Sequence, residues 1–415
     1  MILLGHSLIY IFLFISLYFE VFLLTTYIEN YSQINHENTT LGTKLSRYPR
    51  VAIMVPCWNE ETTISKTLHS LLNLDYPKDK LEIIVIDDGS TDNTWQVIQK
   101  FATYQQIRLF HTENQGKYKA LNFGLTQSTS EMVGCLDADS YVTKDTLTTI
   151  VRYFENKEVM AVTPSVKIFK PKNPLQLIQS VEYNWGVFTR KLFSYLGALY
   201  VTPGPFSIFR RTVFNTIGGY RHAHNTEDME LAMRMQSHHM KIANAHNAHV
   251  YTIAPPTLRK LYKQRLRWTY GFIKNAIDYR YIFFKKEYGN LGVYILPMAS
   301  ISIVSSVYVL SMTIFSLISR LFHFLQKIQI VGFDFHIFPL SFSLFSINTE
   351  FIALASTIAF FGTVTMIFIS RKMATGKTSI GMDMVYFLTL YGFIAPVWLA
   401  KAVFNAIFSI KTSWR

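Results

Sequence analysis

Paired carboxylates at the ends of apolar runs are the first residues in this sequence that suggest chemistry. Asp137 and Asp139 stand two residues apart near the end of the apolar run 131–140. A second acidic pair, Asp87 and Asp88, lies near the end of an earlier apolar run. Where a chain leaves a strand, two carboxylates can turn toward one hard cation. Mg²⁺ and Mn²⁺ favour such oxygen ligands and bridge to substrate phosphates. A turn or a helix cap is the alternative interpretation of these residues.

A third acidic cluster, Thr226-Glu227-Asp228, opens a helical pattern. A carboxylate that faces a substrate hydroxyl can act as a general base, so Glu227 and Asp228 are candidate catalytic residues. The same residue types also cap helices and match the helix dipole, which is the alternative here. Lys117 follows a glycine at the start of another helical pattern. Such a turn can present backbone N–H groups and an ammonium group to a diphosphate.

Short apolar runs that alternate with helical patterns must position these residues. We predict strands at 51–56, 81–90, 107–112 and 131–140, and helices at 64–74, 92–101 and 116–125. This alternation predicts an α/β domain with a mostly parallel sheet, which we expect over residues 45–255. Ligands of open sheets bind at the carboxyl ends of the strands, where the acidic pairs lie.

Composition narrows the classes of protein. The chain of 415 residues is 50% hydrophobic and has a net charge of +13. Its two cysteines, Cys57 and Cys135, cannot build a disulfide framework, and we expect reduced thiols in buried strands. The positive charge leaves a nucleic-acid-binding or transport protein as a rival class. Because the cations are not gathered in one patch with aromatic residues, and the acidic strand ends would repel phosphates, we expect no nucleic acid partner.

Four apolar segments are long enough to cross a bilayer of about 30 Å at about 1.5 Å per residue. They cover residues 2–28, 291–318, 351–369 and 384–410. This predicts a multi-pass protein of the cell membrane with one transmembrane helix in 1–28 and three in 291–410. Cations follow the first segment and lie in the loop 371–377, which by the positive-inside rule places the domain in the cytosol and the C-terminus outside. Residues 321–348 have two alternative interpretations, a loop outside the cell or a segment that lies in the membrane interface.

The segment 257–287 joins the domain to the second apolar segment. Two prolines before Thr257 predict a helix start with Thr257 as its cap. Apolar residues then recur at steps of three or four and form one stripe, made of Leu258, Tyr262, Leu266, Tyr270, Ile273, Ile277 and Tyr281. Gln264, Arg267 and Trp268 fall on the opposite face. Such a helix fits the bilayer interface with its polar face as the floor of an active site, and a basic helix that only anchors the domain is the alternative.

The order of these motifs resembles a known family. VPCWNEE, DDGS, GK, DAD, TED and QRLRW follow one another as in the processive family-2 glycosyltransferases of the membrane synthase type. That family includes synthases of cellulose, chitin, hyaluronan and poly-N-acetylglucosamine. The match covers residues 51–268 and the flanking apolar segments, and several motifs in one order are far more specific than any one of them. The resemblance implies a nucleotide-sugar-binding domain of the GT-A type.

The resemblance also implies roles for individual residues. The nucleotide-sugar would contact Trp58, Glu60, Asp87, Asp88, Lys117 and Asp137. The metal, Mg²⁺ or Mn²⁺, would contact Asp137 and Asp139. The catalytic residues would be Asp228 as general base, Glu227 beside it, and Arg267 at the leaving diphosphate. The acceptor would meet Gly204, Gln264 and Trp268.

What the resemblance implies for function is a membrane-embedded inverting enzyme. It would polymerise a β-linked polysaccharide from a UDP-sugar and pass the chain across the membrane. TED is similar to the cellulose, chitin and poly-N-acetylglucosamine synthases, whereas GPFSIFRR is closer to the hyaluronan synthases. TED, the size of the chain and the four apolar segments favour UDP-N-acetylglucosamine as donor. The expected partners are this donor, the growing polysaccharide and the lipid bilayer, and an accessory subunit is left open. The alternative is a non-processive transferase that moves one sugar to a lipid.

Overall fold

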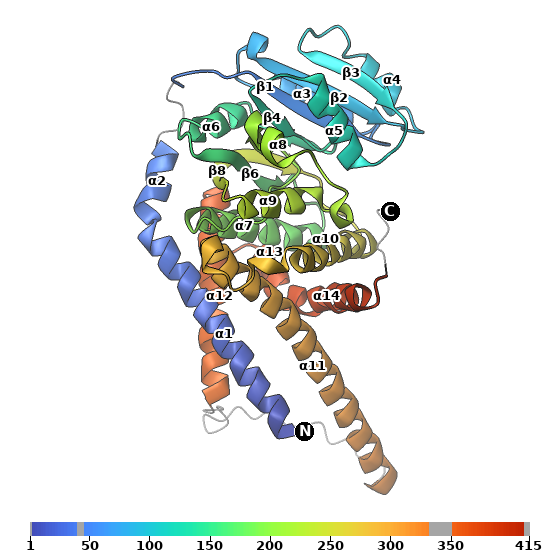
Figure 1. The fold of residues 1–415 in the computed structure, drawn as a ribbon. Helices are drawn as coiled ribbons and strands as arrows, with labels where there is room; N and C mark the ends of the chain where they lie inside the picture. The colour runs from blue at the N-terminus through green and yellow to red at the C-terminus, as the bar shows by residue number, and fades with distance from the viewer. Residues whose placement is uncertain (1, 40–44, 332–350, 411–415) are drawn as a thin grey trace.

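A mixed sheet forms the upper domain of the protein, and long helices extend from its lower side (Figure 1). The computed structural model describes residues 2–39, 45–331 and 351–410. The strands are β1 (Val51–Cys57), β2 (Leu81–Asp88), β3 (Ile107–Thr112), β4 (Met132–Cys135), β5 (Ser140–Val142), β6 (Val159–Ile168), β7 (Ile208–Arg210) and β8 (Lys241–Thr252). They follow the order β3-β2-β1-β4-β7-β6-β8-β5.

The predicted α/β class with a mostly parallel sheet is confirmed. β1 lies between β2 and β4, and all three run parallel, as do β2 and β3. β7 is the antiparallel insertion between β4 and β6. Because parallel strands end at the same edge of a sheet, Asp88 at the end of β2 and Asp137 after β4 are brought to one side.

Helices cover both faces of the sheet, which explains why a central strand such as β1 is a continuous apolar run rather than an alternating one. One core joins the sheet to α3 (Ile64–Leu72), α4 (Thr94–Gln99) and α6 (Thr146–Tyr153). The other core joins it to α5 (Lys117–Gln127), α8 (Arg211–Ile217) and α9 (Glu227–Ser237). The acidic strand ends thus stand on a rigid, close-packed base.

The remaining helices lie below the sheet (Figure 1). They are α1 (Ile2–Glu29), α2 (Tyr31–Thr39), α7 (Pro174–Tyr195), α10 (Leu258–Asp278), α11 (Leu296–Val331), α12 (Phe351–Thr375), α13 (Met382–Tyr386) and α14 (Gly392–Ile407). Short π-helical segments precede α11 and α14, at Leu291–Ile295 and Phe387–Tyr391. Short 3₁₀ helices occur at Lys78–Lys80, Ala223–Asn225, Arg280–Ile282 and Lys286–Tyr288.

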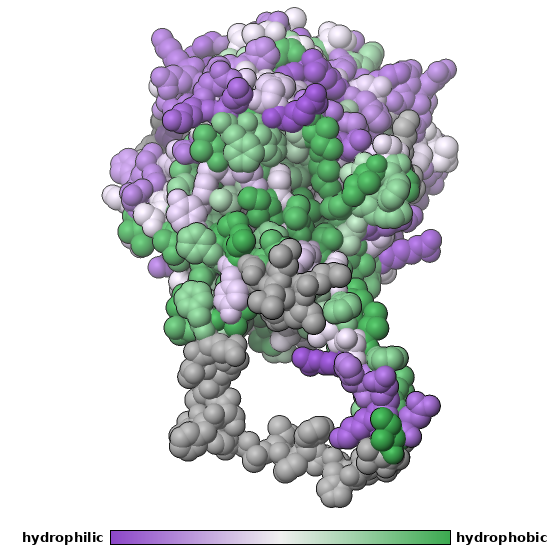
Figure 2. All heavy atoms as spheres, turned by 60° about the horizontal axis from the view of Figure 1, so that its bottom comes forward, coloured by the Kyte–Doolittle hydropathy of each residue, from purple (hydrophilic) through white to green (hydrophobic). Residues whose placement is uncertain are grey.

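Four helical segments of the described chain are long and apolar enough to cross a membrane, and they cover Leu8–Glu29, Leu291–Ile330, Phe351–Thr375 and Met382–Ile407. α1, α11 and α12 descend together from the domain (Figure 1). α11 continues without a break through residues 321–331, which sequence reasoning left open, and residues 332–350 lie outside the described part. Seen from below, hydrophobic side chains gather in the middle of the molecule, and hydrophilic ones lie above them on the domain and again at the lower right of the view (Figure 2).

α14 differs from the other apolar segments in its direction. It runs crosswise beside α10 instead of descending with α1, α11 and α12 (Figure 1). The physical reason is a small core in which Leu261 of α10 packs against Ala395 and Trp398 of α14. The predicted fourth span, 384–410, therefore lies along the base of the domain, and the C-terminal end of α14 is on the domain's side (Figure 1).

α10 is the amphipathic helix that the sequence suggested, but it is shorter than 257–287. It ends at Asp278, and Thr257 caps its start by accepting a hydrogen bond from the backbone N–H of Lys260. Its apolar stripe is divided between two surroundings. Tyr262 and Leu266 pack into the core shared with α14, whereas Leu258, Ile277 and Tyr281 are exposed.

A buried ionic cluster ties the membrane helices to the domain through α2. The carboxylate of Glu37 pairs with Lys191 of α7 and accepts hydrogen bonds from Tyr153 (2.6 Å) and Tyr195 (3.0 Å). Burial alone would raise the pKa of Glu37, but bonds from His246, Lys191 and Tyr153 lower it to about 2. Because the carboxylate is held this firmly, α2 and α7 are fixed to one another.

Candidate active site

A cavity of about 800 Å³ opens at the carboxyl edge of the sheet and reaches down to α7 and α10. All the site residues predicted from the sequence except Asp87 line this cavity. They are Trp58, Glu60, Asp88, Lys117, Asp137, Asp139, Gly204, Glu227, Asp228, Gln264, Arg267 and Trp268. Residues that are far apart in the sequence therefore face one space. Such a concave site with few convergent polar groups is typical of a ligand-binding cavity.

Lys117 is the ionic centre of the upper cavity. Its Nζ lies 2.8 Å from an oxygen of Asp137 and 3.0 Å from one of Glu227. Although burial opposes the charged form, these two carboxylates raise the pKa of Lys117, and Lys117 in turn lowers the pKa of Glu227. Gly204 lies against this pair, because a Cβ there would come within 2.9 Å of the Lys117 Nζ. The predicted acceptor residue Gly204 thus borders Lys117 and Asp137, the residues that the sequence predicts for the diphosphate.

The two acids at the end of β2 have different surroundings. Asp88 lines the cavity and accepts hydrogen bonds from the backbone N–H groups of Gln115 (3.0 Å) and Gly116 (2.9 Å). These N–H groups, which the sequence suggested for a diphosphate, are thus used to shape the turn before Lys117. Gly116 has φ of 92°, a conformation that glycine adopts without strain.

Asp87, predicted to contact the nucleotide, does not line the cavity. Its side chain is fully buried, bonds the Ser90 hydroxyl, and lies 2.7 Å from Nδ1 of His111. The alternation of side chains along β2 explains the difference, since neighbouring residues point to opposite faces of a strand. Asp87 therefore holds the loop after β2 in place.

Trp58 and Glu60 follow the end of β1 and face the same space. The Glu60 carboxylate accepts a hydrogen bond from the Thr63 hydroxyl at 2.7 Å, and the Glu60 backbone N–H donates to Thr94 at 2.7 Å. The loop that carries both side chains is therefore held to the starts of α3 and α4.

Asp139 has the surroundings expected of a metal ligand. Burial, together with the charges of Asp137 and Glu60, raises the pKa of Asp139 to about 7. A divalent cation would relieve this repulsion, and two carboxylates are the oxygen donors that Mg²⁺ and Mn²⁺ prefer. Within residues 2–39, 45–331 and 351–410 no group of three or more His, Cys, Asp or Glu side chains could hold a metal. The donor set of Asp137 and Asp139 therefore fits a cation whose remaining ligands are phosphate oxygens and water.

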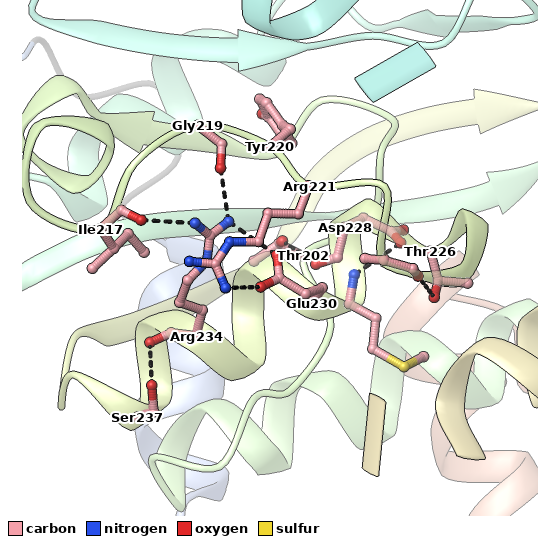
Figure 3. Close-up of polar contacts among 12 residues, drawn as sticks. Thr202, Ile217, Gly219, Tyr220, Arg221, Thr226, Asp228, Glu230, Arg234 and Ser237 are labelled. Atoms are coloured by element: carbon pink, nitrogen blue, oxygen red, sulfur yellow. Dashed lines mark hydrogen bonds and ion pairs between the residues drawn. The ribbon is translucent and has the colours of Figure 1, made fainter. Parts of the chain in front are cut away.

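Asp228 stands at the start of α9 and lines the same cavity as Lys117. Its carboxylate accepts a hydrogen bond from the Met229 backbone N–H at 2.9 Å, and its carbonyl oxygen accepts one from the Thr202 hydroxyl at 2.8 Å (Figure 3). Burial and the neighbouring Glu227 raise the pKa of Asp228 to about 6. A carboxylate with this pKa is charged at neutral pH and still basic enough to accept a proton.

The rest of α9 is anchored on its far side. Glu230 pairs with Arg234 at 2.9 Å, and the guanidinium of Arg234 also donates to the carbonyl oxygens of Ile217 and Gly219 (Figure 3). Tyr279 donates to Glu230 at 2.7 Å from beyond the end of α10. These buried bonds keep α9, and with it Asp228, in a fixed position relative to α10.

α10 forms the floor of the cavity with Gln264, Arg267 and Trp268. Arg267 donates to the carbonyl oxygen of Asn225 at 3.0 Å, just before the Thr226-Glu227-Asp228 cluster. The guanidinium of Arg265 lies 4.3 Å from the centre of the Trp268 ring and also holds Glu182 of α7 in a two-pronged ion pair. Sequence reasoning passed over Arg265, although it is the residue that orients Trp268.

α7 contributes a whole wall of the cavity that no motif indicated. Its lining residues recur along one helical face and are Glu182, Tyr183, Gly186, Thr189, Arg190 and Phe193. Their spacing of one, three or four residues was the signal available in the sequence. The same spacing occurs in any helix with one buried face, so it does not distinguish a cavity wall from a core.

Comparison with known proteins agrees with this geometry. The profile of "Glycosyl transferase family 2" matches residues 52–218. A poly-beta-1,6-N-acetyl-D-glucosamine synthase of Staphylococcus epidermidis is 30% identical over 262 residues, which are 62% of this chain and 63% of the relative. The synthase of the same name from Staphylococcus aureus strain COL is 33% identical over 224 residues, 53% of this chain and 54% of the relative. The matches thus span less than two thirds of the length of these relatives.

One solved structure resembles the chain along almost its whole length. A mannosyltransferase from Pyrobaculum calidifontis in complex with GDP-Man and Mn²⁺ has a TM-score of 0.59 and 18% sequence identity, covering 96% of this chain and 99% of the other. At this identity the likeness is one of fold. The profile match includes strand-end residues that line the cavity, so over residues 52–218 the chain is similar to glycosyl transferase family 2.

Proposed function

We propose that this protein is a membrane-embedded polysaccharide synthase that uses UDP-N-acetylglucosamine. The observation that carries the proposal is the continuous cavity from the acidic strand ends to the polar face of α10. One end has the groups for a nucleotide diphosphate, and the other has a tryptophan beside the membrane helices. The relatives named poly-beta-1,6-N-acetyl-D-glucosamine synthases support the choice of donor and of a β-linked product.

The chemistry is a single displacement. Asp228 accepts the proton of the acceptor hydroxyl, and the hydroxyl oxygen attacks the anomeric carbon of the donor as the bond to the diphosphate breaks. The new glycosidic bond has inverted configuration, UDP leaves with the bonding electron pair, and Asp228 carries the proton until it is lost to solvent. Lys117 and Arg267 supply positive charge toward the departing diphosphate.

A divalent cation belongs to this proposal. Asp137 and Asp139 would hold Mg²⁺ or Mn²⁺, which when bound neutralises charge on the diphosphate. The residues of the chain have their own tasks: Lys117 keeps Asp137 in place through the 2.8 Å ion pair, and Gly204 leaves room for both groups.

The direct test is a donor screen with product sizing. Membranes that contain the full chain are incubated with each radiolabelled UDP-sugar in turn, and the products are separated by gel mobility. We expect long product from UDP-N-acetylglucosamine only. A product of one added sugar on a lipid would instead identify the non-processive alternative, and no product from any UDP-sugar would reject the proposal.

Trp268 is proposed to stack on the acceptor sugar. We expect Trp268→Phe to retain part of the activity and Trp268→Leu to lose most of it, because aromatic stacking contributes about 0.5–1.5 kcal/mol, roughly a threefold to tenfold effect. A processive enzyme repeats this contact at every addition, so Trp268→Phe should also shorten the chains. Gel mobility of product from matched amounts of folded protein measures both effects. Equal rate and chain length in all three proteins would leave Trp268 as a membrane anchor.

We further propose that the domain lies in the cytosol and that α1, α11 and α12 cross the membrane. Arg47 and Arg50 follow α1 on the side of the domain, as the positive-inside rule requires. α14 would lie in the interface beside α10, with Phe393 and Ile407 toward lipid, since 76% and 71% of these side chains are exposed. Both ends of α14 would then be cytosolic.

Reporter fusions check this topology. We expect reporters fused after Lys377 and after Arg415 to be both cytosolic, because α14 runs along the domain rather than away from it. Sequence composition alone predicts the second reporter outside. Opposite locations for the two reporters would show that 384–410 crosses the bilayer.

A further inference from the structure

Arg190 is a cavity cation for which the described part of the chain provides no carboxylate. Its Nε is buried and has no hydrogen-bond partner. By contrast, the cavity cation Lys117 pairs with two carboxylates, and Arg265, which lies behind the floor and not in the cavity lining, pairs with Glu182. Burial lowers the pKa of Arg190 to about 10, which still leaves it charged. A charged guanidinium with unused N–H donors in a confined site is costly unless a ligand supplies acceptor atoms.

The position of this guanidinium is fixed by Gly186. Gly186 lies one turn before Arg190 on α7, and the guanidinium folds back over it. A Cβ on Gly186 would lie 3.0 Å from Nη1 and 3.4 Å from Cζ of Arg190. The glycine thus makes the space in which the guanidinium rests against the helix, so the group is held in place before any ligand arrives.

Aromatic side chains line the cavity together with Arg190, and they include Tyr183, Phe193 and Tyr200. Against the larger opposing effect of burial, Tyr183 and Tyr200 raise the pKa of Arg190. Tyr200 packs against Phe193 and Phe272, with ring centres 6.2 and 5.8 Å apart. Aromatic faces suit the C–H face of a sugar ring, and planar N–H donors suit its oxygen atoms.

We propose that Arg190 and Tyr183 of α7 form a second acceptor-sugar subsite together with Tyr200, which follows α7. The guanidinium donates hydrogen bonds to hydroxyl or acetamido oxygens of the growing chain, and the two tyrosines border the sugar ring. This subsite extends the acceptor path from Trp268 on α10 along the neighbouring wall formed by α7, since Arg265 lies near both the Trp268 and the Tyr183 rings. It rests on the proposed function, because it takes the acceptor to be a saccharide.

Binding to the full-length protein in detergent tests the subsite without requiring turnover. The probes are a β-1,6-linked N-acetylglucosamine trisaccharide and UDP with Mn²⁺, each measured by calorimetry. We expect Arg190→Gln to bind the trisaccharide about tenfold more weakly, the scale of a lost charged hydrogen bond, and to bind UDP as the wild type does. The affinity of Arg190→Lys for the trisaccharide should be intermediate. Gly186→Ala should also bind the trisaccharide more weakly, because the added methyl group displaces the guanidinium. Arg108→Gln, which removes an exposed arginine paired with Glu82, is the matched control.

The outcomes separate the hypotheses. Weaker UDP binding in Arg190→Gln would assign Arg190 to the donor diphosphate and overturn the subsite, and so would an unchanged affinity for the trisaccharide. The subsite would also be overturned if the wild-type protein bound UDP but not the trisaccharide. Failure of the donor screen, by contrast, would reject the proposed function. If Arg190→Gln lowers the melting temperature, the trisaccharide affinities of Arg190→Lys and Gly186→Ala decide instead, because both variants keep the positive charge. Wild-type affinity in both would overturn the subsite.

Discussion

Asp228→Asn should reduce turnover by at least about 10²-fold, the usual scale of a general base. The amide keeps the shape of the side chain and can still accept the hydrogen bond from the Met229 N–H, but it cannot take a proton from the acceptor. UDP-sugar affinity should stay nearly unchanged, because the proposed mechanism assigns donor binding to Asp137 and Lys117. Initial rates with radiolabelled donor, together with calorimetric binding of UDP, measure the two effects separately.

The pH profile provides an independent check on this base. Because burial and Glu227 raise the pKa of Asp228 to about 6, the carboxylate is charged above this pH and protonated below it. Wild-type kcat/KM should therefore fall about tenfold per pH unit below pH 6. The residual kcat/KM of Asp228→Asn should not show this decrease. Asp79→Asn, an exposed acid on a surface turn, is the control and should behave as wild type. A collapse of UDP affinity in Asp228→Asn would make Asp228 a binding residue instead.

Removal of the divalent cation should abolish synthesis. EDTA should stop incorporation of sugar, and added Mg²⁺ or Mn²⁺ should restore it, because the diphosphate then regains its counter-charge. Asp139→Asn should remain folded and membrane-inserted but lose about 10²–10³-fold or more in rate, the range for loss of an electrostatic stabiliser.

A binding readout distinguishes metal ligation from a structural role of Asp139. Wild-type affinity for UDP should increase when Mn²⁺ is added, and this increase should be absent in Asp139→Asn at an unchanged melting temperature. Asp79→Asn again serves as control. Synthesis at full rate in EDTA would show that the carboxylates act without a metal.

Most of the fold was predictable because its signals are local. β1 is an uninterrupted apolar run, β2 contains the apolar run Ile83–Ile86, and residues 107–112 were predicted with the bounds that β3 has. Residues at the strand ends reach one cavity for a topological reason, since parallel strands share one edge. These features depend on periodicity and order along the chain, which are visible in one sequence.

The remaining features depend on contacts between distant segments. Asp87 and Asp88 look equivalent in sequence. Only the face of β2 to which each points separates Asp87, which is buried and holds the loop after β2, from Asp88, which lines the cavity. α14 has the composition of a membrane span, and its packing against Leu261 of α10 determines where it lies. Arg190 belongs to no motif, and its surroundings exist only once α7 is placed against the cavity.

The two faces of α7 have a practical consequence for preparing this enzyme. Phe188 and Leu192, which have no exposed surface, pack against Leu23 of α1 and Met366 of α12 on the side of α7 away from the cavity. A truncated soluble version of residues 45–255 would uncover this apolar face and would also lose Glu37, the partner of Lys191. One face of α7 thus lines the cavity and the other packs against two apolar helices. We therefore expect the intact chain in a detergent or lipid environment to be the form in which this cavity keeps its shape.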